Sequence, residues 1–182
     1  WHPRQPGRKP GSISPQSHLF KDTGVALMRT SDEPASLCCI YQSGFAFGQA
    51  TNLKQRRRFG MEQHDAQADG GVSILVKGVP ITAPAPSQYR RGFPIQSVVT
   101  VNGGGHYMDG RVLGVRPRKA WLSRMLSYQD TKEKTIALGE NTGAYREELG
   151  VLRSRRRVTL MKLPPELVVE DSIRLRRPQR IA

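Results

Sequence analysis

The chain has 182 residues, enough for one ordinary domain or for a small domain with a long appendage, and too few for two large domains. Apolar residues make up 37% of it, a low share for a chain that buries itself completely, and 29 Lys+Arg against 15 Asp+Glu give a net charge of +14. This balance indicates a polyanionic partner, and the predominance of arginine favours phosphate contacts over tethering to a membrane. No run approaches 18 consecutive apolar residues, so the sequence predicts no membrane partner.

The first 60 residues combine weak apolar patterning with positive charge. Residues 1–18 are rich in proline, glycine, serine and basic side chains, the composition of an extended arm that cannot fold alone. Residues 24–28 and 38–41 are short strands or turns of helix, and the sequence leaves both interpretations open. The basic stretch 54–60 is a solvated surface or a phosphate contact, with the candidate contact residues Lys54, Arg56, Arg57 and Arg58.

The pattern of apolar and turn-forming residues changes near residue 96. Residues 70–81 are bounded by glycines and rich in β-branched side chains, which predicts a strand. The proline-rich stretch 83–94 then breaks regular structure and is the best candidate boundary. We therefore predict a basic, largely irregular N-terminal extension over 1–96, with short strands or helix, and a folded domain over 97–182.

The second part consists of short strand-like runs separated by Gly, Asn, Asp and Pro. Regular short strands with turn signals and no helical period indicate a small, mainly β barrel or sandwich. The predicted strands are residues 97–101, 111–115, 119–126, 134–138, 155–161 and 172–176.

Arginines alternate with aliphatic residues in the last two of these runs. Because successive side chains of a strand point to opposite faces, Arg174 and Arg176 would project together from the outside of the domain. In the preceding run, Arg155 and Arg157 have the opposite parity to Arg156. We interpret the two strands as a surface that neutralises several phosphates; the alternative is an edge strand protected from aggregation by its charges.

The sequence shows no constellation for catalysis or metal binding. His106 and Asp109 follow a triple glycine and could act as a base and its orienting group, but no nucleophile or second acid accompanies them. The adjacent Cys38 and Cys39 would strain a mutual disulfide and supply half a zinc site at most. The sequence thus predicts a binding protein and not an enzyme, with no catalytic residue, no metal, no cofactor and no small-molecule substrate.

Motifs in the second part follow one another in a fixed order. A first strand opens with Gly110, Arg111 and Val112; a basic pair, Arg118 and Lys119, precedes the second strand; Tyr145 precedes a basic segment at 153–157; and a closing motif contains Val169, Asp171, Ile173, Leu175, Arg177 and Pro178. Over roughly residues 105–180, this order resembles small-subunit ribosomal protein seventeen of the universal family, in its bacterial and mitochondrial form.

The resemblance implies a five-stranded Greek-key barrel of the OB-fold type that binds the 5′ domain of small-subunit ribosomal RNA. The extension over 1–96 would contact neighbouring ribosomal proteins and RNA. Duplex RNA is held chiefly through phosphates, 2′-hydroxyls and shape, which arginine-bearing strands can supply. The candidate RNA-contacting residues of the domain are Arg111, Arg116, Arg118, Lys119, Arg153, Arg155, Arg156, Arg157, Arg174, Arg176 and Arg177.

The sequence departs from the family pattern near its end. Glu170 replaces the glycine of the closing motif, the loop at 129–143 is long, and the strand that closes the family's barrel has no counterpart before Ala182. A strand at 72–76 or at 97–101 would have to pair along the open edge instead.

The expected location is the mitochondrial matrix, on the small ribosomal subunit. The sequence begins at Trp1, which fits a cleaved import signal as well as it fits unobserved N-terminal residues. Two alternatives stay open: an accessory subunit of an organellar membrane complex, and a non-ribosomal OB-fold RNA-binding factor. The second would need aromatic side chains for base stacking, and they are scarce in this chain.

Overall fold

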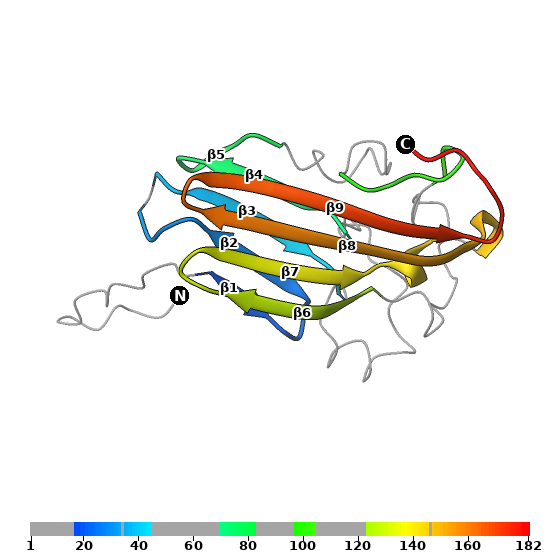
Figure 1. Cartoon of the computed structure of the whole chain (residues 1–182), viewed down its shortest axis with the longest axis horizontal. Helices are drawn as coiled ribbons and strands as arrows, with labels where there is room; N and C mark the ends of the chain where they lie inside the picture. Colours follow the sequence, from blue (N-terminus) through cyan, green and yellow to red (C-terminus); the bar gives the residue numbers. More distant parts are fainter. Residues whose placement is uncertain (1–16, 34, 45–69, 83–96, 105–122, 146) are drawn as a thin grey trace, which may run out of the picture.

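Two antiparallel sheets lie face to face in the computed structural model (Figure 1), which describes residues 17–33, 35–44, 70–82, 97–104, 123–145 and 147–182. The first sheet has five strands in the order β1-β2-β3-β4-β5, and the second has four in the order β6-β7-β8-β9. The prediction of a mainly β protein is therefore confirmed, and the arrangement is a two-layer β-sandwich.

Each sheet is built from strands that follow one another in the chain. The first sheet consists of β1 (His18–Phe20), β2 (Val25–Arg29), β3 (Leu37–Gln42), β4 (Val72–Val76) and β5 (Val79–Pro80). The second consists of β6 (Arg124–Asp130), β7 (Lys134–Glu140), β8 (Val151–Lys162) and β9 (Pro165–Leu175), with two short 3-10 helices, η3 (Thr142–Ala144) and η4 (Glu147–Leu149), between β7 and β8.

Local sequence explains where several strands begin and end. In β2 the buried side chains Ala26 and Met28 alternate with partly exposed ones, the pattern of a strand with one face in a core. The predicted strand over 70–81 is instead a hairpin of β4 and β5. Lys77 and Gly78 form its turn with φ angles of 51° and 75°, the paired positive values that two-residue hairpins of type I′ require.

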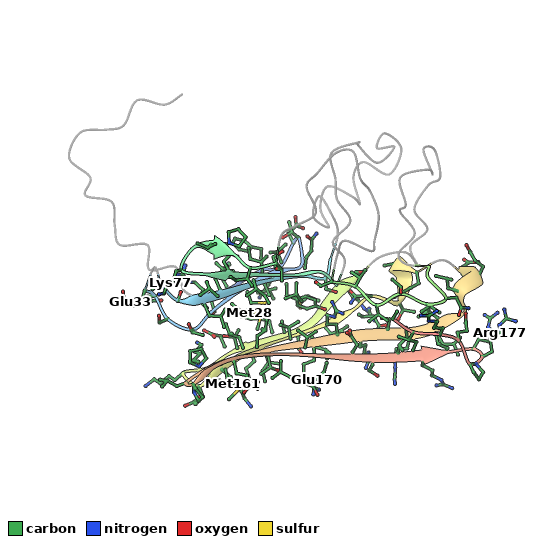
Figure 2. The ribbon with its side chains drawn as sticks, turned by 90° about the horizontal axis from the view of Figure 1, so that it is seen from above. Met28, Glu33, Lys77, Met161, Glu170 and Arg177 are labelled. Carbon is green, nitrogen blue, oxygen red and sulfur yellow. The ribbon has the colours of Figure 1, made fainter. Side chains whose placement is uncertain are left out.

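The hydrophobic core lies between the two sheets and draws on both halves of the chain. It contains Ala26, Met28, Cys39, Tyr41 and Val72 from the first sheet and Ala137, Val158 and Leu160 from the second. Figure 2 shows Met28 in the layer between the sheets and Glu170 on the outer side of the second sheet. The predicted boundary at residue 96 thus separates two sheets that share one core.

The OB-fold barrel is not confirmed. Among the described residues the two sheets are open, and no strand pairing joins one sheet to the other. β4, which could have closed a barrel, pairs with β3 in the first sheet. Residues 97–101 form no strand, only isolated bridges from Val101 to Gly104 and Ile181. The predicted strand at 111–115 and the proline-rich boundary at 83–94 lie outside the described residues.

Among the same residues, no helix is long and apolar enough to cross a membrane.

Candidate functional site

Strands β8 and β9 carry arginines on both faces of the second sheet. The two strands pair in register from Val151 opposite Leu175 to Lys162 opposite Pro165, with a bulge between Val151 and Arg153. Arg156 points into the sandwich together with the buried Val158, and its side chain is only 7% exposed. On the opposite face, the side chains of Arg155 and Arg157 are 41% and 53% exposed. Alternation along one strand therefore divides the arginines into an inner and an outer set.

The inner arginine is fully occupied by partners inside the protein. Its Nε and Nη2 donate to the two carboxylate oxygens of Asp171 at 2.8 and 2.7 Å, a bidentate pairing. Its Nη1 donates to the backbone carbonyls of Gly70 and Ser97. The predicted RNA contact of Arg156 stays a prediction that its burial disfavours, because the guanidinium holds two loop segments against β8.

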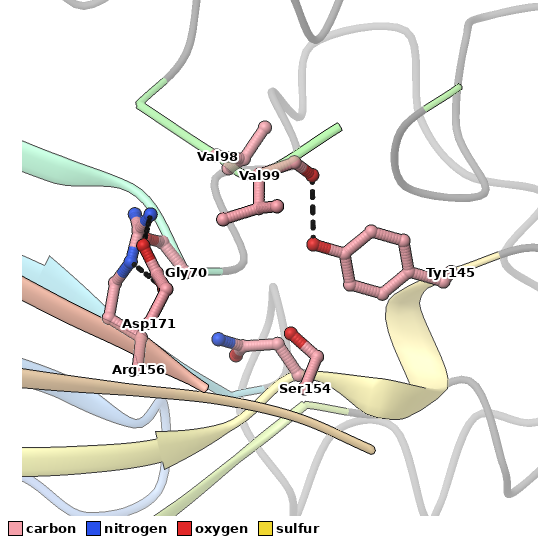
Figure 3. A pocket seen from close by; sticks show the side chains of 8 residues that line it. Gly70, Val98, Val99, Tyr145, Ser154, Arg156 and Asp171 are labelled. Atoms are coloured by element: carbon pink, nitrogen blue, oxygen red, sulfur yellow. Dashed lines mark hydrogen bonds and ion pairs between the residues drawn. The ribbon is translucent and has the colours of Figure 1, made fainter. Parts of the chain in front are cut away.

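A small cavity lies beside this guanidinium (Figure 3). It is lined by Gly70, Val98, Val99, Asn141, Tyr145, Ser154, Arg156 and Asp171. Its volume of about 10 Å³ matches one water at most, so no substrate fits inside it. The hydroxyl of Tyr145 donates to the carbonyl of Val99 at 2.8 Å, and burial raises the pKa of this phenol. The cluster therefore fastens residues 97–99 to the second sheet and is no pocket for chemistry.

Two outer arginines are neutralised by neighbouring carboxylates. The Nε of Arg155 donates to Glu140 on β7 at 2.8 Å, and Thr142 donates its hydroxyl to the same carboxylate. Burial alone would raise the pKa of Glu140, but these two hydrogen bonds together with the charges of Arg155 and Arg124 outweigh it and hold the pKa below its ordinary value. Arg157 faces Glu170 on β9 at 3.6 Å, with both side chains more than half exposed.

The remaining outer arginines gather at one end of the second sheet. Arg153 on β8 lies directly opposite Arg174 on β9, and Arg176 and Arg177 follow where β9 ends. All four are exposed, and none of their side chains forms an ion pair or a hydrogen bond with the part of the chain that the structure describes. Figure 2 shows Arg177 at the end of the sheet opposite to Met161. We refer to Arg153, Arg174, Arg176 and Arg177 as the arginine end.

The C-terminal residues are tied down beside the arginine end. Thr100 and Ala182 exchange two backbone hydrogen bonds of 2.7 and 3.1 Å, and the amide of Asn102 donates to the carbonyl of Arg180 at 2.8 Å. The side chain of Gln179 donates to the carbonyl of Leu149 at 2.7 Å. These bonds fix the backbone that follows Arg177, so the arginine end is held at both sides of the strand pair.

The structure brings together only some of the predicted contact residues. Arg153, Arg174, Arg176 and Arg177 form one exposed group, whereas Arg155, Arg156 and Arg157 each face a carboxylate. The others, Lys54, Arg56, Arg57, Arg58, Arg111, Arg116, Arg118 and Lys119, lie outside the described residues. Sequence reasoning missed the partners Glu140, Glu170 and Asp171. Glu170 and Asp171 are acidic residues of the closing motif, but the sequence does not show their register against β8.

Residues considered for catalysis or metal binding are not tested by the described structure. His106 and Asp109 lie outside it. Within the described segments, no group of three or more His, Cys, Asp and Glu residues is placed to hold a metal ion. Cys39 is buried in the core, which raises the pKa of its thiol to about 12, and burial also raises that of Cys38.

The fold is similar to that of known structures, and three of these are a heparan sulfate lyase, a mutant of it and heparinase III. The first is heparan sulfate lyase HepC from Pedobacter heparinus, with a TM-score of 0.60, 11% identity, and coverage of 91% of this chain and 23% of that one. A HepC mutant has a TM-score of 0.59 and 10% identity, with coverage of 91% of this chain and 23% of that one. Heparinase III has a TM-score of 0.60 and 16% identity, with coverage of 96% of this chain and 24% of that one. At such low identity the likeness shows the fold alone, and this chain spans about a quarter of the length of these enzymes.

The sequence comparisons identify no relative. No family model matches the chain, and no curated protein matches it either. The resemblance to a ribosomal protein therefore gains no support from them.

The predicted function as a ribosomal small-subunit protein is wrong. The chain adopts a sandwich that heparan sulfate lyase HepC matches along 91% of its length and heparinase III along 96%, and not the barrel of the ribosomal family. The arginine-rich segments that suggested the ribosomal family form a hairpin in that sandwich, and three of their arginines are paired with carboxylates of the same sheet. The expected mitochondrial location and RNA contacts stay predictions.

Proposed function

We propose that this chain is the β-sandwich domain of a lyase-like protein and that it binds acidic polysaccharide through exposed arginines. The observation that carries the proposal is the coverage: the likeness takes in nearly all of this chain and about a quarter of each matched lyase. Two of the matched proteins are described as heparan sulfate lyases, whose substrate is a polyanion. A net charge of +14 suits such a partner.

Physical chemistry supports a polyanion held on the sheet surface. Guanidinium presents a planar fork of donors that matches carboxylate and sulfate oxygens, and it is less strongly hydrated than ammonium. The arginine end supplies four such groups, two of them on paired strands, which position side chains more firmly than loops do. The cavity beside Arg156 is too small for a sugar, so the exposed arginine end is the better candidate for binding than that cavity.

Binding assays with matched polymers test the proposal. Heparan sulfate, dextran as an uncharged glycan, and duplex RNA are compared by titration calorimetry at about 0.15 M salt and again at higher salt. We expect heparan sulfate to bind most tightly, with an affinity that falls as salt rises, and dextran not to bind. Absence of heparan sulfate binding, or tighter binding of the RNA, would contradict the proposal.

Catalysis is a separate question from binding. The expectation that the chain is not an enzyme stays a prediction, and the residues considered for catalysis, His106 and Asp109, lie outside the described residues. Incubating the chain with heparan sulfate and measuring the polymer's length decides it. We expect binding without shortening, and shortened polymer would show that the domain carries lyase activity itself.

A further inference from the structure

We propose that Arg153 and Arg174 together form a subsite for one sulfate group of an acidic polysaccharide. This inference rests on the proposed function and names the position and the chemical group that it would recognise. It starts from an arrangement that costs the folded protein stability: two like charges directly opposite each other on neighbouring strands.

The like-charge pair is an exception in its own hairpin. Two residues further along β8, Arg155 lies opposite the neutral Ser172 and bonds to Glu140 on its other side. Another two residues on, Arg157 lies opposite Glu170. Between β8 and β9, opposite charges therefore meet wherever two charged residues are in register, except at Arg153 and Arg174. An anion lying between these two guanidinium groups would remove the repulsion.

The backbone around the pair holds both side chains on one outer face. Arg153 follows the bulge in β8, an irregularity that changes the direction of a side chain relative to the regular strand. Gly150, at a φ of 62°, turns the chain into β8, and its carbonyl accepts a 2.8 Å hydrogen bond from the amide of Arg176. The start of β8 and the end of β9 are thus fastened to each other, and Arg176 lies next to the pair.

The geometry favours sulfate over carboxylate. A carboxylate has two oxygens, which a single guanidinium fork can bind in a bidentate manner, as Asp171 is bound by Arg156. A sulfate group presents three terminal oxygens in a pyramid and can accept from two forks at once. Two facing arginines that pair with no carboxylate among the described residues are therefore better matched to sulfate. Phosphate groups present similar oxygens, and the experiment below distinguishes a sulfated polysaccharide from RNA.

The test compares two double variants with the same net charge. Arg153→Gln with Arg174→Gln removes the proposed subsite, and Arg155→Gln with Arg157→Gln removes two arginines that already have carboxylate partners. We expect the first variant to bind heparan sulfate at least about tenfold more weakly than the second, because only it loses charge-assisted hydrogen bonds to the ligand. Equal losses in the two variants would overturn the subsite and indicate attraction by net charge alone.

Two further measurements separate the subsite from the proposed function and from a structural role. Without ligand, the Arg153→Gln, Arg174→Gln variant should melt at the same temperature as the wild type or higher, because repulsion is relieved. Inorganic sulfate, compared with chloride at equal ionic strength, should raise the melting temperature of the wild type and not that of this variant. If the wild type binds no heparan sulfate, both proposals are overturned. The sulfate subsite alone is overturned if the wild type binds desulfated glycan as strongly as heparan sulfate. It is also overturned if the wild type binds RNA more strongly and the Arg153→Gln, Arg174→Gln variant loses that binding.

Discussion

The two faces of strand β8 put the same residue type to different uses. Arg156 on the inner face is 7% exposed and donates to Asp171 and to two backbone carbonyls brought from distant segments. Arg153 on the outer face is exposed and lies opposite another arginine. The arginines of one run in the sequence therefore do not all belong to the same surface. Strand parity and the residues in register decide which guanidinium stabilises the fold and which is left to meet a partner.

Replacing the inner arginine should have the largest effect. Arg156→Leu leaves the carbonyls of the buried Gly70 and of Ser97, and the partly exposed carboxylate of Asp171, without their donor. We expect the free energy of unfolding to fall by about 3 kcal/mol, since Arg156 is the buried partner of an ion pair and also satisfies two backbone carbonyls. Chemical denaturation monitored by tryptophan fluorescence or circular dichroism measures it.

The matched control for this change is Arg153→Leu, the same substitution on the same strand but on the outer face. It should alter the free energy of unfolding by no more than about 0.5 kcal/mol, because surface substitutions away from special features have small effects. Equal destabilisation by both variants would show that the inner and outer sets are not distinct. Adding Asp171→Leu to Arg156→Leu should recover part of the loss, because no unpaired carboxylate is left.

A glycine on β7 tests how closely the inner face is packed. A Cβ atom added at Gly139 would collide with the hydroxyl of Tyr41 and with the side chain of Ser43. Neither can move freely, because Tyr41 donates to the carbonyl of Arg156 at 3.3 Å and Ser43 donates to Asn141 at 2.8 Å. Gly139→Ala should therefore lower the free energy of unfolding by about 2 kcal/mol, as overpacking does. A melting temperature equal to that of the wild type would contradict this account of the core.

The carboxylate that neutralises Arg155 should give a smaller effect that depends on pH. Glu140→Gln weakens the hydrogen bonds from Thr142 and Arg155, and we expect a loss of about 1 kcal/mol near neutral pH. The folded pKa of Glu140 lies below its ordinary value of 4.5, so its contribution is present above that value and is lost as the pH falls through the folded pKa. Denaturation series at several pH values should show the two proteins converging in acid. A difference that is constant down to low pH would contradict the assignment.

Strand periodicity predicted much of the second sheet. Residues 134–138 lie within β7 and 155–161 within β8, and the alternation that placed Ile173 and Leu175 inside and Arg174 outside agrees with their burial. These segments follow a period of two because one of their faces is buried. Residues 97–101 have the same composition but form only isolated bridges, because the Val101 position is held by Gly104 and the C-terminal residues and not by a neighbouring strand.

Contacts between residues far apart in the chain could not be predicted from the sequence. The first sheet shares a core with the second through contacts such as Tyr41 to Arg156, which are 115 residues apart, and no local pattern reveals that distance. For the same reason the sequence alone predicts an extension over 1–96 and does not reveal the shared core. The partners of the outer arginines were equally hidden, since Glu140 meets Arg155 only once β7 and β8 are in register. Composition predicts a polyanionic partner, but only the register shows which arginines of the hairpin have no carboxylate beside them among the described residues.

The smallest effect is expected at Arg157, whose ion pair with Glu170 lies on the outer face of the second sheet. Its pair with Glu170 spans 3.6 Å and both side chains are more than half exposed, so solvent and salt screen the attraction. A double-mutant cycle of Arg157→Gln and Glu170→Gln should give a coupling energy below about 0.5 kcal/mol that vanishes at high salt. A coupling above about 1 kcal/mol would mean that outer arginines also hold the hairpin together. In that case Arg155 and Arg157 could no longer serve as the neutral reference against which Arg153 and Arg174 are measured.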